Sequence, residues 1–538
     1  MRENMKNLYA LTLGFALALS FEACTDQDFD EKYYDPSKTT TVTCDKMFTG
    51  TLMAGNNYTF NAYWRMYTWD HNFGKLAQTI GFNNNSGSVY FINDGYANDR
   101  WNGFYNILAQ FRVLQDTYAR ENATKQAEDK IFVDMAEVFL YDHLSQIVDL
   151  FGPAPFTKAG YLGITGNLAS SYPAYDSDVD LYKMMLTRLD ELYTDIQSIK
   201  SSGSFVQTQL TAQDYLNKGD LDKWIAYANS LRLRLGIHVA AQGDLTSEGR
   251  AAIASAAGRP LVTTWDNSIK VESDYDGFNY WENFRDAFKD INYTASQRMI
   301  DAMQITGEDD PRLAVMYTPR EDGKYFGKAT SETDAEQNER DTYSAYKDRY
   351  YAHLDSATFV CCNDLVSPVF SASEAYFLLA EAYQQGYATG DAKEAFKKGI
   401  LESVKQYYAQ NMKSDHSKLA VPATTYIADK VPEDDAILAY ADKVWDVYPD
   451  KLEGIMTQKW LHFGIMQAPQ AWTDIRRTGY PALDYPEDGQ SQAYKTIIQR
   501  IKYPNTEMAN NKANYEANKA NVDGDSAYFT LFWAKTLK

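Results

Sequence analysis

The side chains most often used in catalysis are scattered along this 538-residue chain. Its six histidines are isolated, and none forms an H-E-x-x-H pair or another close pair. There is no G-x-S-x-G nucleophile motif, and GKYFGKAT (323–330) has the wrong spacing for a phosphate-binding loop. The pattern predicts no catalytic residue, no cofactor and no metal site. The histidines are His71, His143, His238, His353, His416 and His462.

Carboxylates are abundant but carry little information in so acidic a chain. A glycosidase needs two of them held at a defined separation in a cleft, which sequence alone cannot establish. The stretch ESDYDGFN (272–279) resembles part of a calcium loop, but Asn283 stands where the acidic twelfth residue belongs. We therefore interpret it as a solvated turn. A secreted glycoside hydrolase stays open as an alternative.

Cys24 is the cysteine with the clearest chemical role. An apolar run, Leu8 to Leu19, follows a basic start and is too short to span a membrane, which takes about 20 apolar residues. Cys24 comes directly after Ala23, which resembles the lipobox of bacterial lipoproteins, although Phe21 and Glu22 depart from the usual residues. We predict a signal peptide over 1–23 and a lipid on Cys24. A plain signal peptide with an incidental cysteine is the alternative.

The residues after Cys24 form an acidic tether. Asp26, Asp28, Asp30 and Glu31 fall in an apolar-poor stretch that cannot pack against a core. Acidic residues in this place resemble the surface-export signal of Bacteroidetes lipoproteins. We predict a tether and N-terminal segment over 24–45 and an outer-membrane protein that faces the outside of the cell.

The remaining cysteines are Cys44, Cys361 and Cys362, too few for a fold held by disulfides. Small, partly buried thiols are the simplest interpretation, although a vicinal disulfide between Cys361 and Cys362 is a strained alternative. The net charge of −21 repels phosphate backbones and argues against a nucleic-acid partner. Aromatic residues make up 14% of the chain and suit either a helical core or the faces of sugar rings.

Helical periodicity dominates the chain. Residues 128–151 place apolar side chains at spacings of three and four, and the pattern stops at Gly152 and Pro153. Similar patterns predict helices over 182–196 and 221–241. The fold class that follows is mainly α.

One segment matches a tetratricopeptide repeat. With Ser373 as position 1, the packing positions are occupied by suitable small and large residues, and Gly386 and Gly390 supply the turn. No second unit matches as well, so degenerate helical pairs elsewhere must complete the scaffold. The packing residues are Tyr376, Leu379, Ala380, Tyr383, Ala392, Phe396 and Gly399.

Between about 251 and 370 the helical pattern breaks into a region rich in Asp, Asn, Tyr and Gly. Long loops in a compact protein are usually functional or disordered. We predict one domain over 46–538 in which this irregular region forms a loop-rich, ligand-facing half.

Six segments together resemble the SusD/RagB family of nutrient-binding outer-membrane lipoproteins, in the family's order and over nearly the whole mature chain. The resemblance implies a single domain with four helical pairs of tetratricopeptide type and a loop-rich half packed against them. Trp224, Trp472, Arg476 and Arg477 are expected to serve the scaffold. The segments are DLFGPAPFT (149–157), GDLDKWIAYANSLRLRLG (219–236), DDPRLAVMY (309–317), SEAYFLLAEAYQQG (373–386), QAWTDIRRTGYPAL (470–483) and RIKYPNTEMANN (500–511).

The resemblance implies a non-catalytic protein that captures an oligosaccharide or a peptide outside the cell. It would pass this nutrient to a TonB-dependent outer-membrane transporter of the SusC/RagA type, held at the pore by its lipid anchor. A tetratricopeptide-type adaptor that binds only a protein is a second alternative, beside the glycoside hydrolase.

The candidate ligand-binding residues are aromatic residues in loop-like contexts. Trp101 lies in YANDRWNGFY at a predicted helix entrance, close to where members of the family carry a ligand-stacking Trp, and Tyr90 lies just before it. Tyr280 and Trp281 form a pair in GFNYWENF. We expect these rings to be exposed and to stack on a ligand; packing in the core is the alternative for each.

Overall fold

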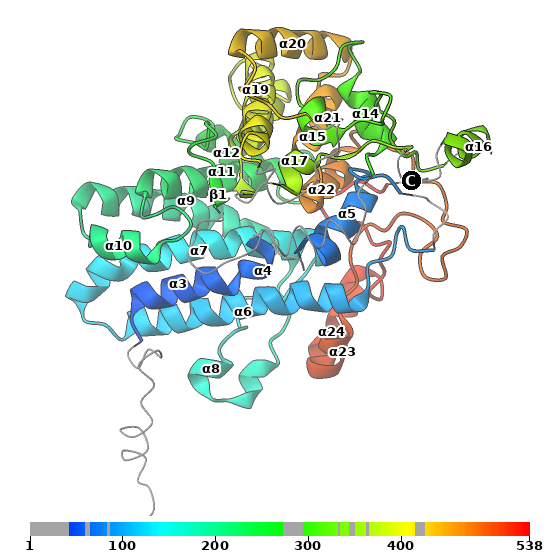
Figure 1. Ribbon diagram of the computed structural model, residues 1–538. Coiled ribbons are helices and arrows are strands. Elements are labelled where there is room, and N and C mark those ends of the chain that lie inside the picture. The colour runs from blue at the N-terminus through cyan, green and yellow to red at the C-terminus, as the bar shows by residue number, and fades with distance from the viewer. Residues whose placement is uncertain are drawn as a thin grey trace, which may run out of the picture. The chain divides into compact units, whose positions relative to one another are not determined.

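Helices of very different length follow one another along the chain, as the computed structural model in Figure 1 shows. The structure describes residues 42–59, 65–82, 87–272, 294–331, 334–343, 350–361, 365–414 and 426–537. Several predictions fall outside these residues: the signal peptide over 1–23, the lipidated Cys24, the acidic residues of the tether, all of the turn at 272–279 except Glu272, the Tyr280–Trp281 pair, and Cys362 of the alternative vicinal disulfide. The mainly α fold class is confirmed.

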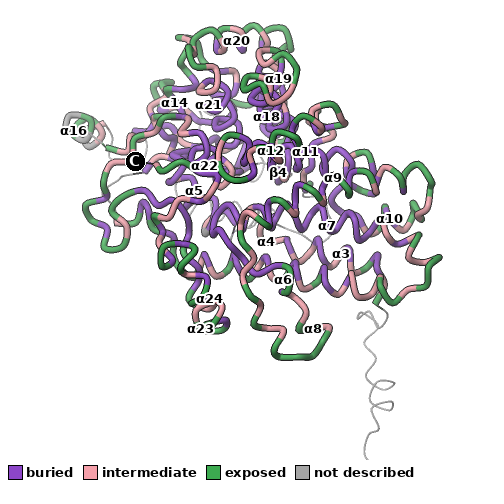
Figure 2. Tube along the Cα trace, turned by 180° about the vertical axis from the view of Figure 1, so that it is seen from behind, coloured by how far each residue is buried: buried purple, intermediate pink, exposed green. Residues whose placement is uncertain are grey.

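The longest helices are α6 (Asp94–Ala119) and α7 (Ala123–Phe151). Each begins at an asparagine whose side chain accepts backbone N–H groups of the first turn, which stabilises the helix start. Helix α7 ends where predicted, because Gly152 adopts a positive φ of 86° that other residues rarely take. From Ile131 to Ser145 every residue of α7 is buried, including the polar residues between the apolar positions (Figure 2).

Three further helices pack beside this pair. Helix α9 (Asp178–Ser202) contacts α7 and α11 (Leu221–Val239), and α11 also contacts α12 (Thr246–Ala256). Helix α3 (Cys44–Ala54) lies against both α6 and α7. Trp224 on α11 is fully buried and its indole N–H donates to Asp214 at 2.7 Å, as expected of a scaffold residue.

The predicted tetratricopeptide unit is a helical pair, α18 (Ala372–Gln384) and α19 (Ala392–Asn411). The two helices approach closely where Gly399 faces Phe377, because an added Cβ would lie 2.7 Å from the ring. Helices α20 (Asp434–Val447), α21 (Lys451–Phe463) and α22 (Ala468–Thr478) continue from this pair, with contacts from α20 to α19 and from α21 to α18.

Arg476 and Arg477 tie the end of α22 to distant parts of the chain, as the sequence predicts. The Arg476 guanidinium donates to the backbone oxygens of Asp149 and Gln499, at 2.8 and 3.0 Å. The Arg477 guanidinium pairs with the carboxylates of Glu381 and Asp474. Buried charges of this kind are stable only when they are paired.

Where the structure describes it, the region 251–370 holds short elements, in agreement with the break in periodicity. Strand β1 (Ile269–Val271) pairs antiparallel with β4 (Ser367–Phe370), and β2 (Tyr317–Thr318) pairs antiparallel with β3 (His353–Leu354). The short helices of this region are α14 (Gln297–Met303), α15 (Leu313–Met316), α16 (Asp334–Tyr343) and α17 (Ser356–Phe359).

Other short elements lie outside these groups. Near the N-terminal side they are α4 (Asn56–Thr59), the π-helix η1 (Arg65–Asp70) and α5 (His71–Leu76). Elsewhere they are α8 (Leu162–Thr165), η2 (Leu168–Ser171), α10 (Gln207–Gln213), α23 (Asn505–Asn510), α24 (Lys512–Asn518) and η4 (Lys519–Val522). Among the helices that the structure describes, none is long and apolar enough to cross a bilayer.

Candidate functional site

The structure buries both of the predicted ligand-binding residues that it describes. Tyr90 is 1% exposed and its hydroxyl donates to the backbone oxygen of Pro486 at 2.6 Å. Trp101 is 2% exposed and lies in the second turn of α6. The expectation of two exposed rings is therefore wrong, and the role of either residue in binding stays a prediction.

Trp101 is buried because it lies where α6, the end of α7 and the C-terminal segment meet. Its ring centroid is 5.1 Å from that of Phe151 and 5.5 Å from that of Tyr503, both edge to face. Tyr105, one turn along α6, lies 5.3 Å away and donates its hydroxyl hydrogen to Pro155 O at 2.8 Å. Aromatic clusters of this geometry stabilise a core beyond simple burial.

The outer edge of this cluster borders an open groove. We call it the Trp101 groove and define it by three walls: the exposed side of α6, residues 155–173, and α23 with Asn511. It encloses about 1010 Å³, including open solvent at its mouth. The residues that define the walls are Trp101, Asn102, Tyr105, Ala109, Pro155, Gly160, Leu162, Gly163, Ser170, Ser171, Pro173, Thr506, Glu507, Asn510 and Asn511.

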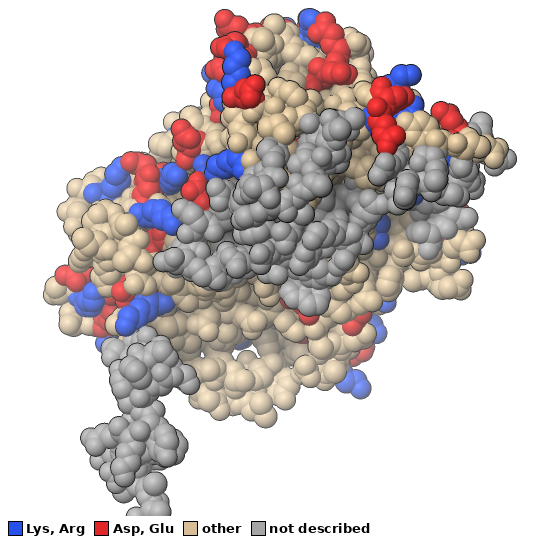
Figure 3. Space-filling model, viewed as in Figure 1, with Lys and Arg blue, Asp and Glu red and all other residues tan. Residues whose placement is uncertain are grey.

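One wall is an excursion between α7 and α9 that carries α8 and η2. Residues 159–175 contain no charged side chain, and they form an uncharged lobe below α6 in Figures 1 and 3. Asp176 closes its base by accepting the backbone N–H groups of Phe156 and Thr157, both at 2.8 Å. Leu162, Leu168 and Tyr172 are 44, 64 and 51% exposed on this wall.

Asn511, on the wall opposite α6, holds residues 155–173 in place, and the rim of the groove carries exposed amides. The Asn511 amide donates to Pro173 O at 2.9 Å and to the Glu507 carboxylate at 2.7 Å. Asn102 and Asn510 are exposed, and within the described chain their side chains make no hydrogen bond. An aromatic and aliphatic floor with amides at the rim is the arrangement expected of a small-molecule or sugar site.

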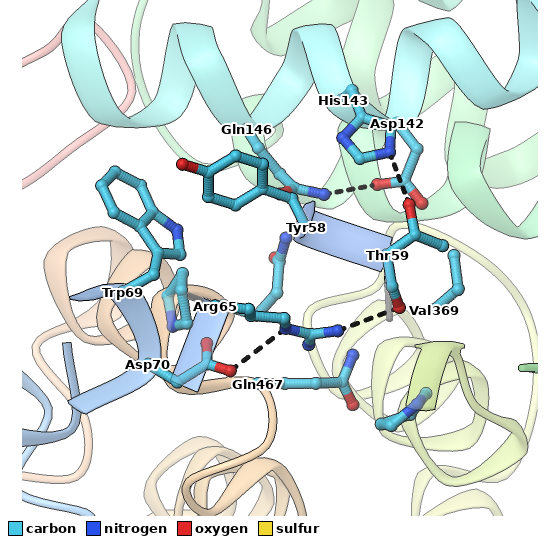
Figure 4. Close-up of a pocket in the computed structure, with 13 residues that line it drawn as sticks. Tyr58, Thr59, Arg65, Trp69, Asp70, Asp142, His143, Gln146, Val369 and Gln467 are labelled. Atoms are coloured by element: carbon cyan, nitrogen blue, oxygen red, sulfur yellow. Dashed lines mark hydrogen bonds and ion pairs between the residues drawn. The ribbon is translucent and has the colours of Figure 1, made fainter. Parts of the chain in front are cut away.

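A second hollow lies beside α7. We call it the polar hollow, and Figure 4 shows it. It encloses about 530 Å³, again including open solvent. Its lining residues are Tyr58, Thr59, Arg65, Trp69, Asp70, Asp142, His143, Gln146, Pro368, Val369, Gln467, Pro469 and Gln470.

Most polar groups of the polar hollow are bonded to the protein itself. The Arg65 guanidinium donates to the Asp70 carboxylate at 3.1 Å, to Thr59 O at 3.2 Å and to Met466 O at 2.7 Å. The Asp142 carboxylate accepts from Gln146 at 3.1 Å and pairs with Arg234 at 3.0 Å (Figure 4).

Burial sets the ionisation of these groups. It raises the pKa of Asp70 to about 7, despite the opposing charge of Arg65. Burial, reinforced by the positive charge of Arg100, holds the pKa of His143 well below its usual range, so the imidazole is neutral. Neutral His143 lies 3.2 Å from the Thr59 hydroxyl. Among the described residues, the hollow is thus a hydrogen-bonded joint between segments, in which Asp70 Oδ1 is a buried oxygen that has no hydrogen-bond partner.

Sequence reasoning missed most of the Trp101 groove. The uncharged excursion at 159–175 was the available signal, since a surface segment of that length without charge is uncommon in so acidic a chain. Asn510 lies in one of the segments that carry the family resemblance, RIKYPNTEMANN, but only the fold brings residues near 102, 163 and 510 together.

The comparison with protein families identifies a match over most of the chain. The family model described as "SusD-like: Susd and RagB outer membrane lipoprotein" matches residues 38–535. A search of curated proteins finds no match.

Several solved structures share the fold. A chitin-binding protein is 21% identical, with a TM-score of 0.69 over 91% of this chain and 99% of its own. A SusD homologue from Parabacteroides distasonis is 20% identical, with a TM-score of 0.68 over 92 and 98% of the two chains. A chitin-binding SusD homologue from Flavobacterium johnsoniae is 19% identical, with a TM-score of 0.67 over 91 and 100%.

Proposed function

The chain belongs to the SusD-like family of outer membrane lipoproteins, and from this premise we propose that it captures a nutrient oligosaccharide outside the cell without chemically altering it. The observation that carries the proposal is the family match over residues 38–535. The absence of any recognisable catalytic motif in the sequence agrees with a binding role.

The Trp101 groove is the candidate site within the described residues. Sugar rings offer apolar CH faces and a rim of hydroxyl groups, so they bind best where apolar surface adjoins unused hydrogen-bonding groups. The groove has Leu162 and Tyr105 on its walls and Asn102 and Asn510 at its rim. Two of the compared structures are described as chitin-binding, which makes chitooligosaccharides the first ligands to test.

The predicted aromatic residues have different roles in this proposal. Trp101 supports the floor of the groove, because its packing against Phe151 and Tyr503 leaves little of its ring free to contact a sugar. Tyr90 does not line the groove: its ring lies 6.4 Å from that of Tyr485 and its hydroxyl donates to the backbone oxygen of Pro486. Tyr280 and Trp281 remain proposed stacking residues that a mutational test must examine separately.

Delivery completes the proposed role. A lipid on Cys24 would hold the protein at the outer membrane, and a TonB-dependent transporter of the SusC/RagA type would receive the ligand. Confining the binding site near a pore raises the local concentration of ligand there. The family description supports the lipoprotein part; the orientation toward the outside and the transporter are inferences from the resemblance.

The binding proposal is tested by calorimetry on the purified protein with chitooligosaccharides, other oligosaccharides and peptides, followed by chromatography of the ligands. We expect saturable binding of one oligosaccharide class and no shorter products after long incubation. Shorter products would favour the glycoside hydrolase. Binding of peptides alone would change the ligand class, and binding of neither would contradict the proposal.

The anchor and the partner are tested in the native host. A tagged chain purified in mild detergent should bring down a large barrel protein in near-equal amount, and Cys24→Ala should leave the outer-membrane fraction. Recovery of the tagged chain alone would contradict the partnership. An unchanged membrane fraction of the Cys24→Ala variant would contradict the anchor.

A further inference from the structure

Three acidic groups from separate parts of the sequence meet at the tip of the α6–α7 pair, away from both hollows. Cys44 is the first residue of α3, Glu121 lies in the connection between α6 and α7, and Asp129 lies in the second turn of α7. One ligand atom from each of the three lies within 4.8 Å of the others. The Cys44 Sγ to Glu121 Oε1 distance is 3.4 Å.

The Cys44 thiol donates to Glu121 Oε1, but two carboxylate oxygens of the cluster lack a donor. Lys125 pairs with one oxygen of Asp129, Nζ to Oδ1 at 2.7 Å, and its side chain is 36% exposed. Asp129 Oδ2 and Glu121 Oε2 are buried atoms that have no hydrogen-bond partner within the described chain. The Asp129 side chain is only 1% exposed. A buried carboxylate oxygen without a donor is costly, so the cluster needs either a proton or a cation.

The surroundings of Cys44 and Glu121 disfavour ionisation of these two groups. Burial and the neighbouring Glu121 carboxylate raise the pKa of Cys44, and burial and the Asp129 carboxylate raise the pKa of Glu121. Without a cation the thiol therefore keeps its proton. A divalent ion at the centre would reverse this balance, because its own charge favours the thiolate and both carboxylates.

We propose that Cys44, Glu121 and Asp129 form a binding site for a divalent cation of the zinc type. In a tetrahedral zinc site, a Zn–S bond of about 2.3 Å and a Zn–O bond of about 2.1 Å place sulfur and oxygen about 3.6 Å apart. The observed 3.4 Å between Cys44 Sγ and Glu121 Oε1 is close to this separation. A sulfur ligand favours zinc over calcium or magnesium, which prefer sites made of oxygen alone.

Binding would proceed by exchange of a proton for the metal. The metal–sulfur bond forms as the Cys44 S–H bond breaks, and the proton passes to the buffer. Glu121 is half-buried, so water can reach the site from its side and complete the coordination. The bound ion would join the start of α3 to the α6–α7 connection and so stabilise the folded protein through ligand linkage.

The test uses the full chain, treated with EDTA and then titrated with Co²⁺ and Zn²⁺. We expect Co²⁺ to produce thiolate-to-cobalt charge-transfer absorption, and Zn²⁺ to displace it, raise the melting temperature and release protons. Cys44→Ser should abolish the absorption, and Asp129→Asn should weaken cobalt binding at least about tenfold. Glu121 lies in the connection between α6 and α7, so Glu121→Gln can replace either of the other variants in this test if that variant does not fold.

Two matched controls separate the site from nonspecific binding. Glu128→Gln removes a neighbouring carboxylate that contacts Lys125 and is 44% exposed, and Cys361→Ser removes another buried thiol. Both variants should bind Co²⁺ as the parent does. A parent chain with no thiolate absorption, or with the same absorption after Cys44→Ser, would overturn the proposal and leave a cluster that holds a proton only.

Discussion

The polar hollow and the Trp101 groove border the same helical pair but use their polar groups in opposite ways. In the polar hollow, the Arg65 guanidinium and the Asp142 carboxylate are bonded to protein partners on several segments. In the groove, Asn102 and Asn510 face solvent and the floor is aromatic. The buried charges of the polar hollow thus hold segments of the chain together, whereas the exposed amides of the groove lie on an open surface.

The difference shows why a hollow rich in charged residues is a poor guide to a ligand site. A buried charge is stable only when its bonds are satisfied, so little of its bonding capacity is left for a ligand. Neutral amides at a rim are hydrated in the free protein and can exchange water for sugar hydroxyl groups at small cost. We therefore expect the polar hollow to stabilise the fold and the Trp101 groove to bind the ligand.

We expect the largest loss of unfolding free energy from a substitution in the polar hollow. Asp142→Ala would leave Arg234, which is 1% exposed, with Glu374 as its remaining ion-pair partner. Removing one member of a buried charge network costs about 3–5 kcal/mol of unfolding free energy. Urea unfolding should show this loss, while Gln470→Ala, at the half-buried edge of the same hollow, should stay within about 0.5 kcal/mol of the parent. Equal stability of the two variants would contradict the assignment.

Trp101→Ala should have the next largest effect, and on stability first. The ring is 2% exposed and contacts Phe151 and Tyr503. We expect a loss of about 3 kcal/mol, at the lower end for a buried Trp because one edge borders open space. Trp101→Phe keeps an aromatic ring and should restore part of the stability. If Trp101→Ala unfolds like the parent but binds no ligand, Trp101 contacts the ligand directly and our placement of it is wrong.

The polar hollow should also make the stability of the protein depend on pH, through Asp70. Because burial raises the folded-state pKa of Asp70 to about 7 from 3.8, the folded state binds a proton more tightly than the unfolded chain does. Its contribution is present at acidic pH and is lost as pH rises through about 7. The loss between pH 5 and 7 is about 2 kcal/mol. Asp70→Asn should remove this part of the slope in urea unfolding at several pH values, and an unchanged slope would contradict it.

Periodicity and caps allowed the scaffold to be predicted because they are local. Apolar spacing indicated α7 and α11, Gly152 marked the end of α7, and the packing positions around Ala380 and Gly399 identified the α18–α19 pair. Arg476 and Arg477 were also correctly assigned to tying segments together.

The site was harder to predict because it depends on contacts between distant segments. Trp101 stands beside Asn and Asp in the sequence, which is typical of a loop, yet the end of α7 and Tyr503 cover its ring. The Trp101 groove joins residues near 102, 163 and 510, and no local pattern indicates that they meet. The burial of Glu137 and Asp142 on α7 has the same origin, since their partners Arg188 and Arg234 lie on α9 and α11.

The most direct test of the central claim fills the Trp101 groove. Gly163 lines it, and a Cβ there would meet no atom within 4 Å, so Gly163→Trp can be accommodated by the backbone while its indole takes up space needed by a ligand. Gly258→Trp is the matched control, because a Cβ at Gly258 is equally unobstructed and that residue is not part of the groove. The measurement is calorimetric titration of parent and both variants with the oligosaccharide selected in the screen. We expect at least about tenfold weaker binding for Gly163→Trp, which is a loss of about 1.4 kcal/mol. Gly258→Trp should bind with parental affinity, and all three proteins should have similar melting temperatures. Parental affinity in a folded Gly163→Trp variant would contradict the claim that the groove binds the ligand.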